Sequence, residues 1–207
     1  FPLDLTEDVL QEAGLAVDAE TFAQLMDAQR KRARAARENL SAAGGWDSTG
    51  LTLENVSPTK FTGYESLAGE SPVTAIVVDG EQTGVLEAGQ SGIVVTAETP
   101  FYAESGGQVG DRGEIRADGA LFEVTDTQKN AEVYYHIGTL REGRLEIGDA
   151  AALAVDAARR QAIARNHSSL HLLQAALRRV LGEHVEQAGS YVDEKRGRLD
   201  FTHFSAM

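Results

Sequence analysis

The sequence of 207 residues contains no cysteine. This absence excludes disulfide bonds and thiolate-ligated zinc within the chain. It is compatible with a cytoplasmic protein, and we expect a cytoplasmic location. Histidine is also scarce, with five in all, so any metal site has few imidazoles to draw on.

Long apolar runs are missing as well. No run approaches the roughly 18 residues that a membrane-spanning helix needs, so we expect no membrane partner. The first residues, FPLDLTEDVL, have neither a basic segment nor an initiator Met, which excludes a secretory signal peptide. This start, together with an end that stops in the apolar–polar alternation of FTHFSAM, predicts a piece of a longer protein.

Positive charge is in deficit. The chain has 19 Lys and Arg against 32 Asp and Glu, which gives a net charge of −13. A protein whose main partner is the phosphate backbone of a nucleic acid is usually basic overall. Two basic islands, residues 29–37 and residues 158–165, interrupt the acidic background. Each is typical of a solvated helix face and is also a candidate for phosphate contacts.

The residue pattern divides the chain into three parts. Residues 1–45 predict helices followed by a Gly-rich linker. Residues 46–155 contain short β-prone runs separated by turn signals such as Asp79-Gly80, which is typical of a small barrel. Residues 156–207 predict a long amphipathic helix and then a hairpin of antiparallel strands. We therefore predict an α+β fold with an N-terminal helical segment, a barrel-like β subdomain and a final α/β subdomain.

The predicted long helix carries two histidines, His167 and His171, beside an apolar face. That face consists of Ile163, Leu170, Leu173, Leu177 and Val180. Residues four apart on a helix point the same way, so the two imidazoles can ligate one metal ion. Zinc takes three or four protein ligands, however, and the Glu of a metalloprotease HExxH helix is missing. The pair is either part of a metal site or two structural histidines on one face.

A second informative segment is TPFYAESGGQVGDRGEI, residues 99–115. Its Ser105-Gly106-Gly107 run lets a backbone approach a ligand closely and turn amide N–H groups toward it. Gln108 adds a polar side chain beside the glycines. The segment lacks the Lys of a P-loop, so it does not imply a phosphate site. A tight turn between strands is the alternative interpretation.

Three segments together resemble the editing domain of alanyl-tRNA synthetases. They are TPFYAESGGQVGD (residues 99–111), RNHSSLHLLQAAL (residues 165–177) and GSYVDEKRGRLDFTHF (residues 189–204). Residues 1–37 resemble the end of the tRNA-recognition region that precedes the editing domain in these enzymes. The resemblance covers nearly the whole chain in the right order. It implies that residues 1–45 end the recognition region and that residues 46–207 form most of an editing domain.

The resemblance implies an aminoacyl-tRNA ester hydrolase. Editing domains of this family hydrolyse wrongly charged tRNA(Ala), chiefly seryl- and glycyl-tRNA(Ala). The aminoacylation pocket for alanine cannot exclude the smaller glycine by size. An apolar pocket rejects a substrate with one extra hydroxyl only about a hundredfold. A second site can instead select serine through hydrogen bonds to its hydroxyl. The implied partners are the aminoacylated 3′ end of tRNA(Ala) and the remainder of the synthetase.

The resemblance also implies roles for particular residues in a cleft between the β-rich part and the HxxxH helix. We expect Gln108 and the backbone of Gly106 and Gly107 to position the ester or the attacking water and to stabilise the oxyanion. Ser105, Thr99 and Ser91 are expected to contact the hydroxyl or amine of the substrate's amino acid. Arg165 and the arginines of residues 30–37 are expected to contact phosphate groups of the tRNA. His203, in the family-like DFTHF motif, is a further expected substrate contact.

In the family a metal ion, taken to be zinc, is held by an HxxxH pair and a later CxxxH pair. His167 and His171 match the first pair, and the second pair is absent from this sequence. The resemblance implies that the chain ends before the second pair and that the zinc site is incomplete. Nothing in the spacing favours His136, His184 or His203 as substitute ligands.

Two other functions stay open. The chain is alternatively a non-catalytic tRNA-binding module, inert because the downstream metal ligands are missing. It is otherwise a structural domain stabilised by a metal, which predicts a large drop in melting temperature on chelation.

Overall fold

The structure of the chain is a computed structural model. It describes residues 10, 14–15, 17–18, 21–29, 31, 53 and 55–204. The chain divides into two compact units, residues 1–47 and residues 48–207. The Gly-rich linker and most of the basic island over residues 29–37 lie outside the described residues. The boundaries expected near residues 45 and 155 stay predictions.

In the first unit, residues 21–29 and residue 31 are helical. Asp18 caps this helix, because its Oδ1 accepts a hydrogen bond of 2.9 Å from the N–H of Thr21. The apolar side chains of Phe22, Leu25 and Met26 on this helix are exposed. None of the described helices of the chain is long and apolar enough to cross a membrane.

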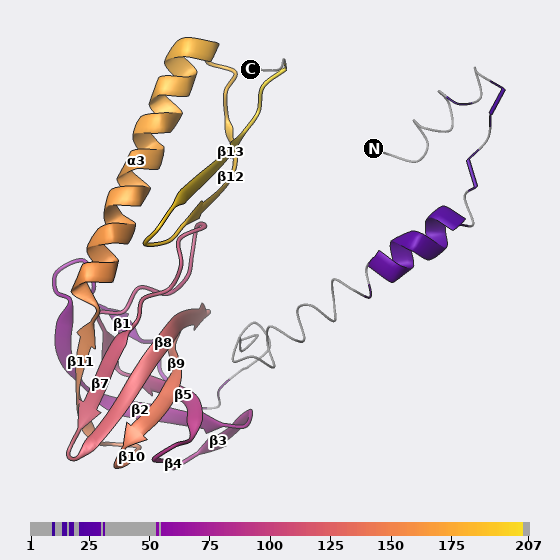
Figure 1. Ribbon diagram of the computed structural model, residues 1–207. Coiled ribbons are helices and arrows are strands. Elements are labelled where there is room, and N and C mark those ends of the chain that lie inside the picture. The colour runs from indigo at the N-terminus through magenta and orange to yellow at the C-terminus, as the bar shows by residue number, and fades with distance from the viewer. Residues whose placement is uncertain are drawn as a thin grey trace. The chain divides into compact units, whose positions relative to one another are not determined.

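In the second unit, antiparallel strands close into a barrel (Figure 1). In order around the barrel they are β11 (Ala150–Val155), β7 (Gly113–Ala117), β8 (Ala120–Asn130), β9 (Val133–Glu142), β5 (Ser91–Thr96) and β2 (Ala68–Val78). The barrel closes because β11 pairs with β7 on one side and with β2 on the other. The predicted mixture of helix and sheet, with a barrel-like β-rich part, is confirmed.

Shorter strands extend the barrel at its margins. They are β3 (Glu81–Thr83), which pairs with β2, β4 (Val85–Glu87), which pairs with β10 (Arg144–Glu146), and β1 (Lys60–Phe61), which pairs in parallel with β6 (Glu98–Thr99). A turn lies at Asp79-Gly80, where the sequence predicts one. Parallel pairing of β1 with β6 brings the start of the second unit against the segment that leads into residues 99–115.

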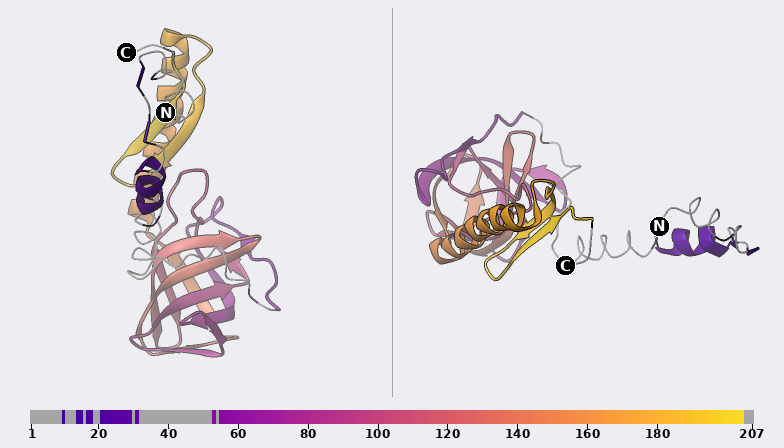
Figure 2. Two further views of the ribbon diagram at one scale, coloured as in Figure 1. Left: turned by 90° about the vertical axis from the view of Figure 1, so that its right-hand side faces the viewer. Right: turned by 90° about the horizontal axis from the view of Figure 1, so that it is seen from above.

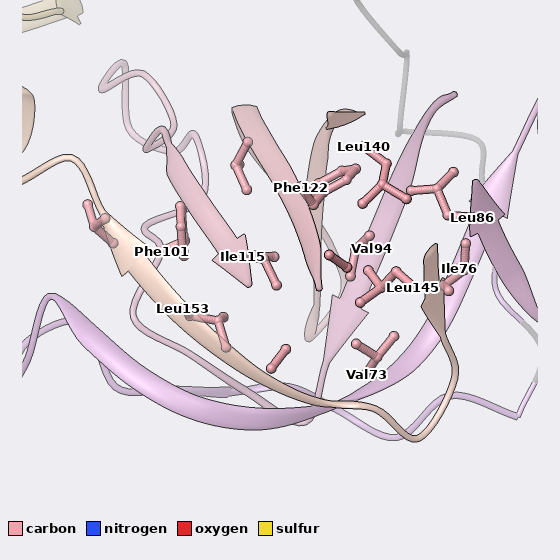
Figure 3. Close-up of a cluster of buried hydrophobic side chains, with 14 residues drawn as sticks. Val73, Ile76, Leu86, Val94, Phe101, Ile115, Phe122, Leu140, Leu145 and Leu153 are labelled. Atoms are coloured by element: carbon pink, nitrogen blue, oxygen red, sulfur yellow. The ribbon is translucent and has the colours of Figure 1, made fainter. Parts of the chain in front are cut away.

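The barrel interior is apolar. Ile115 of β7, Phe122 of β8 and Leu153 of β11 belong to one buried cluster, and Figure 3 shows their side chains in the space enclosed by the strands. Residues of β11 alternate between exposed and buried along the strand, which is the period of a strand with one face in a core. This core holds the β-rich part together without disulfide bonds.

Helix α3 (Ala157–Leu181) follows β11 directly. Asp156 is its N-cap, because the Asp156 Oδ1 accepts a hydrogen bond of 3.0 Å from the N–H of Arg159. The hairpin of β12 (Gln187–Val192) and β13 (Gly197–Phe201) lies along this helix in all three views (Figures 1 and 2). The helix therefore has the barrel at its start and the hairpin along its side.

The apolar face predicted for α3 is only partly covered. Ile163 is buried, whereas Leu173 is 45% exposed and Val180 is 79% exposed. The apolar face is therefore covered in the first half of the helix and largely exposed in the second half. The reason is that a two-stranded hairpin covers one side of α3, and no other described element packs extensively on the rest.

Candidate functional site

The Gly-rich segment forms a tight turn. Ser105 and Gln108 exchange two backbone hydrogen bonds, of 3.1 Å and 3.0 Å, across Gly106 and Gly107. The φ angles of the two glycines are +59° and +82°, a pair of left-handed conformations that side chains with a Cβ rarely adopt. Glycine is therefore favoured at both positions, and the turn presents bare backbone.

This turn is docked on strand β12. The Val192 N–H donates to the carbonyl oxygen of Gly107 at 2.8 Å, and the Val109 N–H donates to the carbonyl oxygen of Val192 at 3.1 Å. A Cβ on Gly107 would lie 2.2 Å from the carbonyl oxygen of Ser190, which is too close for any side chain. The close approach fixes the position of the turn relative to the hairpin.

Helix α3 brings two imidazoles to the same place. The rings of His167 and His171 lie 5.0 Å apart, one helical turn from each other. The Nδ1 atom of His167 lies 2.8 Å from the Oε1 atom of Gln108, a residue that is only 8% exposed. Residues far apart in the sequence thus meet at one point.

A cavity of about 80 Å³ lies at this meeting point. It is lined by Gly106, His167, Leu170, His171, Gln187, Ser190 and Val192. Within the described residues, the N–H groups of Gly106 and Gly107 have no hydrogen-bond partner. The site therefore combines unpaired amide donors, two imidazoles and the polar side chains of Gln187 and Ser190.

The sequence analysis missed Gln187 and Ser190. Both lie on β12, and the Ser190 Oγ donates to the carbonyl oxygen of Gly106 at 3.2 Å. The sequence did show that both residues belong to a predicted hairpin that directly follows the helix with the two histidines. That signal does not say which face of the hairpin meets the turn, because the docking depends on tertiary contacts.

Two adjacent arginines anchor the start of α3 to the loop that carries the turn. The Nε atom of Arg160 lies 2.9 Å from each carboxylate oxygen of Asp111, and Asp111 also accepts a bond of 2.8 Å from the N–H of Tyr102. Arg159 donates from Nη1 to the carbonyl oxygen of Gly110 at 2.7 Å. These two arginines of the predicted basic island are therefore engaged in anchoring the helix, not in presenting charge to a phosphate.

Thr99 lies elsewhere. It is fully buried at the barrel, where its Oγ1 is 2.7 Å from the Nε2 of His136 and accepts a bond of 3.1 Å from the N–H of Phe101. The Nδ1 of His136 donates to the carbonyl oxygen of Val94 at 2.8 Å. Burial lowers the pKa of His136 to about 4, although the bond to Val94 opposes the shift. Thr99 therefore lies outside the cavity lining with its hydroxyl enclosed, and the substrate contact expected of it stays a prediction.

Three other expected contacts also lie away from the cavity lining. The Oγ of Ser91, at the start of β5, is 2.9 Å from the Oγ1 of Thr139 on β9. Arg165 is exposed on α3. His203 follows β13, and its Nδ1 is 2.8 Å from the Nε2 of His184. Of the predicted residues, the structure therefore gathers Gly106, His167 and His171 around the cavity, with the Ser105–Gln108 turn beside them.

The histidines fit zinc as two of the three or four protein ligands that it takes. The other imidazoles do not complete the set, because His136 is enclosed with Thr99 and His184 pairs with His203. Among the described residues, no group of three or more His, Asp or Glu side chains is placed to hold a metal ion. Any further ligands come from water or from outside the described residues.

Larger cavities exist, but fewer groups suited to catalysis line them. One of about 500 Å³ lies against β7, β8 and β11, and its charged lining consists of Arg112, Glu114, Glu123 and Asp156. It contains no histidine and no glycine turn with unpaired amide groups. The smaller cavity is therefore the better candidate, because the reactive groups converge there.

Comparison with known proteins places this chain among the tRNA synthetases. The family described as "tRNA synthetases class II (A)" matches residues 1–159. The chain is 51% identical over 207 residues to an alanine–tRNA ligase of Saccharophagus degradans, covering 100% of this chain and 23% of that protein. It is 49% identical over 205 residues to the alanine–tRNA ligase of Rhodopseudomonas palustris, covering 98% of this chain and 23% of that protein.

A further relative is the alanine–tRNA ligase of Chromohalobacter salexigens, with 51% identity over 208 residues. The chain again spans 23% of the length of that protein. The family match covers more than half of the chain, and the similarity to alanine–tRNA ligases extends along all of it. The chain belongs to the class II tRNA synthetases (A).

Proposed function

We propose that this chain is the greater part of an editing domain, which hydrolyses the ester of seryl- and glycyl-tRNA(Ala). The observation that carries the proposal is the convergence of the Gly106–Gly107 turn, the HxxxH pair and β12 around one cavity. The three segments that meet there are the three that resemble the editing domain of alanyl-tRNA synthetases. The similarity to alanine–tRNA ligases supports the same choice.

The cavity has groups suited to ester hydrolysis. Water attacks the carbonyl carbon of the aminoacyl ester and forms a tetrahedral oxyanion, and the bond from that carbon to the ribose oxygen then breaks. The products are the free amino acid and a tRNA with a 3′-terminal hydroxyl. The unpaired N–H groups of Gly106 and Gly107 are the candidate oxyanion donors, because fixed amide dipoles stabilise charge that develops in the transition state.

The remaining groups orient the substrate. Ser105, Gln187 and Ser190 border or line the cavity and can bond the hydroxyl or amine of a seryl group, so that alanine would leave polar groups unpaired. His167 and His171 would hold zinc, whose chemistry there is to polarise a carbonyl oxygen or to activate water. Arg165 is exposed and remains a candidate phosphate contact for the tRNA acceptor end.

The alternative is a tRNA-binding module without catalysis. It is favoured by one observation: His167 and His171 lie side by side, and no group of three or more candidate metal ligands is found among the described residues. In this alternative the cavity binds the 3′ end, and this chain does not hydrolyse the ester because the downstream metal ligands are missing.

The deciding experiment measures release of serine from seryl-tRNA(Ala) by this chain, with and without zinc. Alanyl-tRNA(Ala) is the substrate control, and His167→Ala is the variant control. Selective release of serine that the variant loses supports the editing hydrolase. Absence of release by a folded chain that still binds tRNA(Ala) would support the binding module.

A further inference from the structure

The contact between Gln108 and His167 indicates which ring nitrogen of His167 carries the hydrogen. The closest atoms are Oε1 of Gln108 and Nδ1 of His167, 2.8 Å apart. The amide oxygen of glutamine carries no hydrogen and can only accept. In this orientation of the Gln108 amide, the hydrogen in the bond belongs to Nδ1 of His167, and the opposite nitrogen, Nε2, carries a lone pair in the neutral ring.

We propose that Gln108 is a positioning residue, which holds His167 in the Nδ1–H tautomer and leaves Nε2 as the metal-binding nitrogen. A neutral imidazole ligates a metal through its unprotonated nitrogen, and a partner on the other nitrogen sets both tautomer and ring orientation. The metal part of this inference rests on the proposed function. The tautomer part does not, because it follows from the hydrogen bond and from the orientation of the Gln108 amide.

The surroundings of Gln108 hold its side chain in place. The backbone N–H and carbonyl groups of Gln108 both form hydrogen bonds with Ser105, and Gln108 also forms a β-bridge with Val192 of β12. The turn on which it lies cannot shift without breaking the close contact between Gly107 and Ser190. Gln108 is therefore held by the loop and the hairpin while its side chain contacts the helix.

The two histidines of the pair are unequal in this respect. In the described part of the chain, the His171 ring has no hydrogen-bond partner, although it lies beside His167. His167 is thus oriented before any metal binds, whereas no hydrogen bond within the described residues fixes the tautomer of His171 before a metal binds. Gln108 thus acts through His167, and the direct contact with ester or water expected of it stays a prediction.

The first test observes the tautomer in the metal-free chain. Long-range ¹H–¹⁵N correlation spectra of ¹⁵N-histidine-labelled protein distinguish Nδ1–H from Nε2–H. We expect His167 to be Nδ1–H in the wild type and in Gln108→Glu, whose carboxylate accepts the same bond, and to lose this preference in Gln108→Met. Gln187→Met is the matched control, because Gln187 lines the same cavity without bonding His167, and it should leave the tautomer unchanged.

Two results would overturn the tautomer assignment. One is an Nε2–H signal for His167 in the wild type, which would mean that the amide NH₂ of Gln108 faces the ring. The other is an unchanged Nδ1–H preference in Gln108→Met, in a chain whose backbone spectrum shows it to be folded.

The second test measures zinc affinity by calorimetry. We expect Gln108→Met to weaken zinc binding by about 10- to 100-fold, the usual effect of losing a partner of a metal ligand, and Gln108→Glu to restore it. Equal affinity in wild type and Gln108→Met, or no zinc binding by the wild type, would overturn the metal role of Gln108. Failure of seryl-tRNA(Ala) hydrolysis with both results as expected would count against the proposed function alone.

Discussion

The barrel and helix α3 bury their apolar side chains to very different extents. The barrel encloses Phe122 and Leu153 almost completely, whereas α3 buries Ile163 and leaves Leu172 and Val180 more than 70% exposed. The barrel is closed, so each strand contributes one face to a common core. The helix is held by the buried Ile163 and by polar contacts at a few points along one side.

This difference means that the barrel contributes most of the folding stability, whereas helix α3 carries the candidate catalytic side chains. The barrel carries the hydrophobic core and fixes the ends of the loop that contains residues 99–111. The helix carries the histidines, and its anchors are the Arg160–Asp111 ion pair and the His167–Gln108 bond. Changes in the barrel should therefore affect unfolding of the whole unit, and changes on the outer side of α3 should affect little.

The largest expected effect comes from the barrel core. Phe122→Ala should lower the free energy of unfolding by about 3–5 kcal/mol, because it removes a fully buried ring and leaves a cavity. Urea-induced unfolding followed by circular dichroism measures the change. A loss below about 1 kcal/mol would contradict the view that this cluster dominates the stability of the second unit.

The next effect comes from the anchor between the two regions. Asp111→Ala should cost roughly 3 kcal/mol, because it leaves the Arg160 guanidinium, whose side chain is 15% exposed, without its charged partner. Glu114→Ala breaks the exposed pair with Arg116 and should cost at most about 1 kcal/mol. Similar losses in the two variants would show that the anchor is no stronger than a surface pair.

A pH dependence should follow from His136. Its pKa is about 4 in the folded chain, against an ordinary value of 6.5 for an exposed histidine, so the unfolded state binds the proton more readily. Stability should therefore fall as the pH drops from about 6.5 toward 4, by up to about 1.4 kcal/mol per pH unit from this residue. Unfolding curves at several pH values measure the slope, and His136→Gln should remove this contribution. An unchanged slope in that variant would argue against a neutral buried imidazole.

The smallest effect is expected on the outer side of α3. Val180→Ser should change the free energy of unfolding by no more than about 0.5 kcal/mol, because the side chain is 79% exposed. The measurement should be repeated over a range of protein concentrations. A larger loss that grows with concentration would reveal that association between copies covers this side.

Local sequence signals predicted much of the fold. The alternation in β11 follows from the period of a strand, and the turn at Asp79-Gly80 follows from residues that favour left-handed backbone. The i,i+4 spacing of His167 and His171 was enough to place both rings on one side of a helix. These features depend on near neighbours in the chain, which is why a pattern can report them.

Other features could not be read from local patterns. The pairing of the Thr99 hydroxyl with His136 on another strand leaves no signal in the local sequence. The exposure of Val180 was also missed, because helical periodicity shows an apolar side without showing what covers it. Both outcomes depend on which distant elements pack together.

Element types, the glycine turn, the paired histidines and the family are all encoded in short stretches of the sequence. Tertiary packing sets which of these features meet. Gly106 and Gln108 reach His167 only because the barrel, the Arg160–Asp111 anchor and strand β12 bring the loop and the helix together. The physical reason is that backbone preferences act over a few residues, whereas a site is assembled by burial and hydrogen bonds between segments distant in the chain.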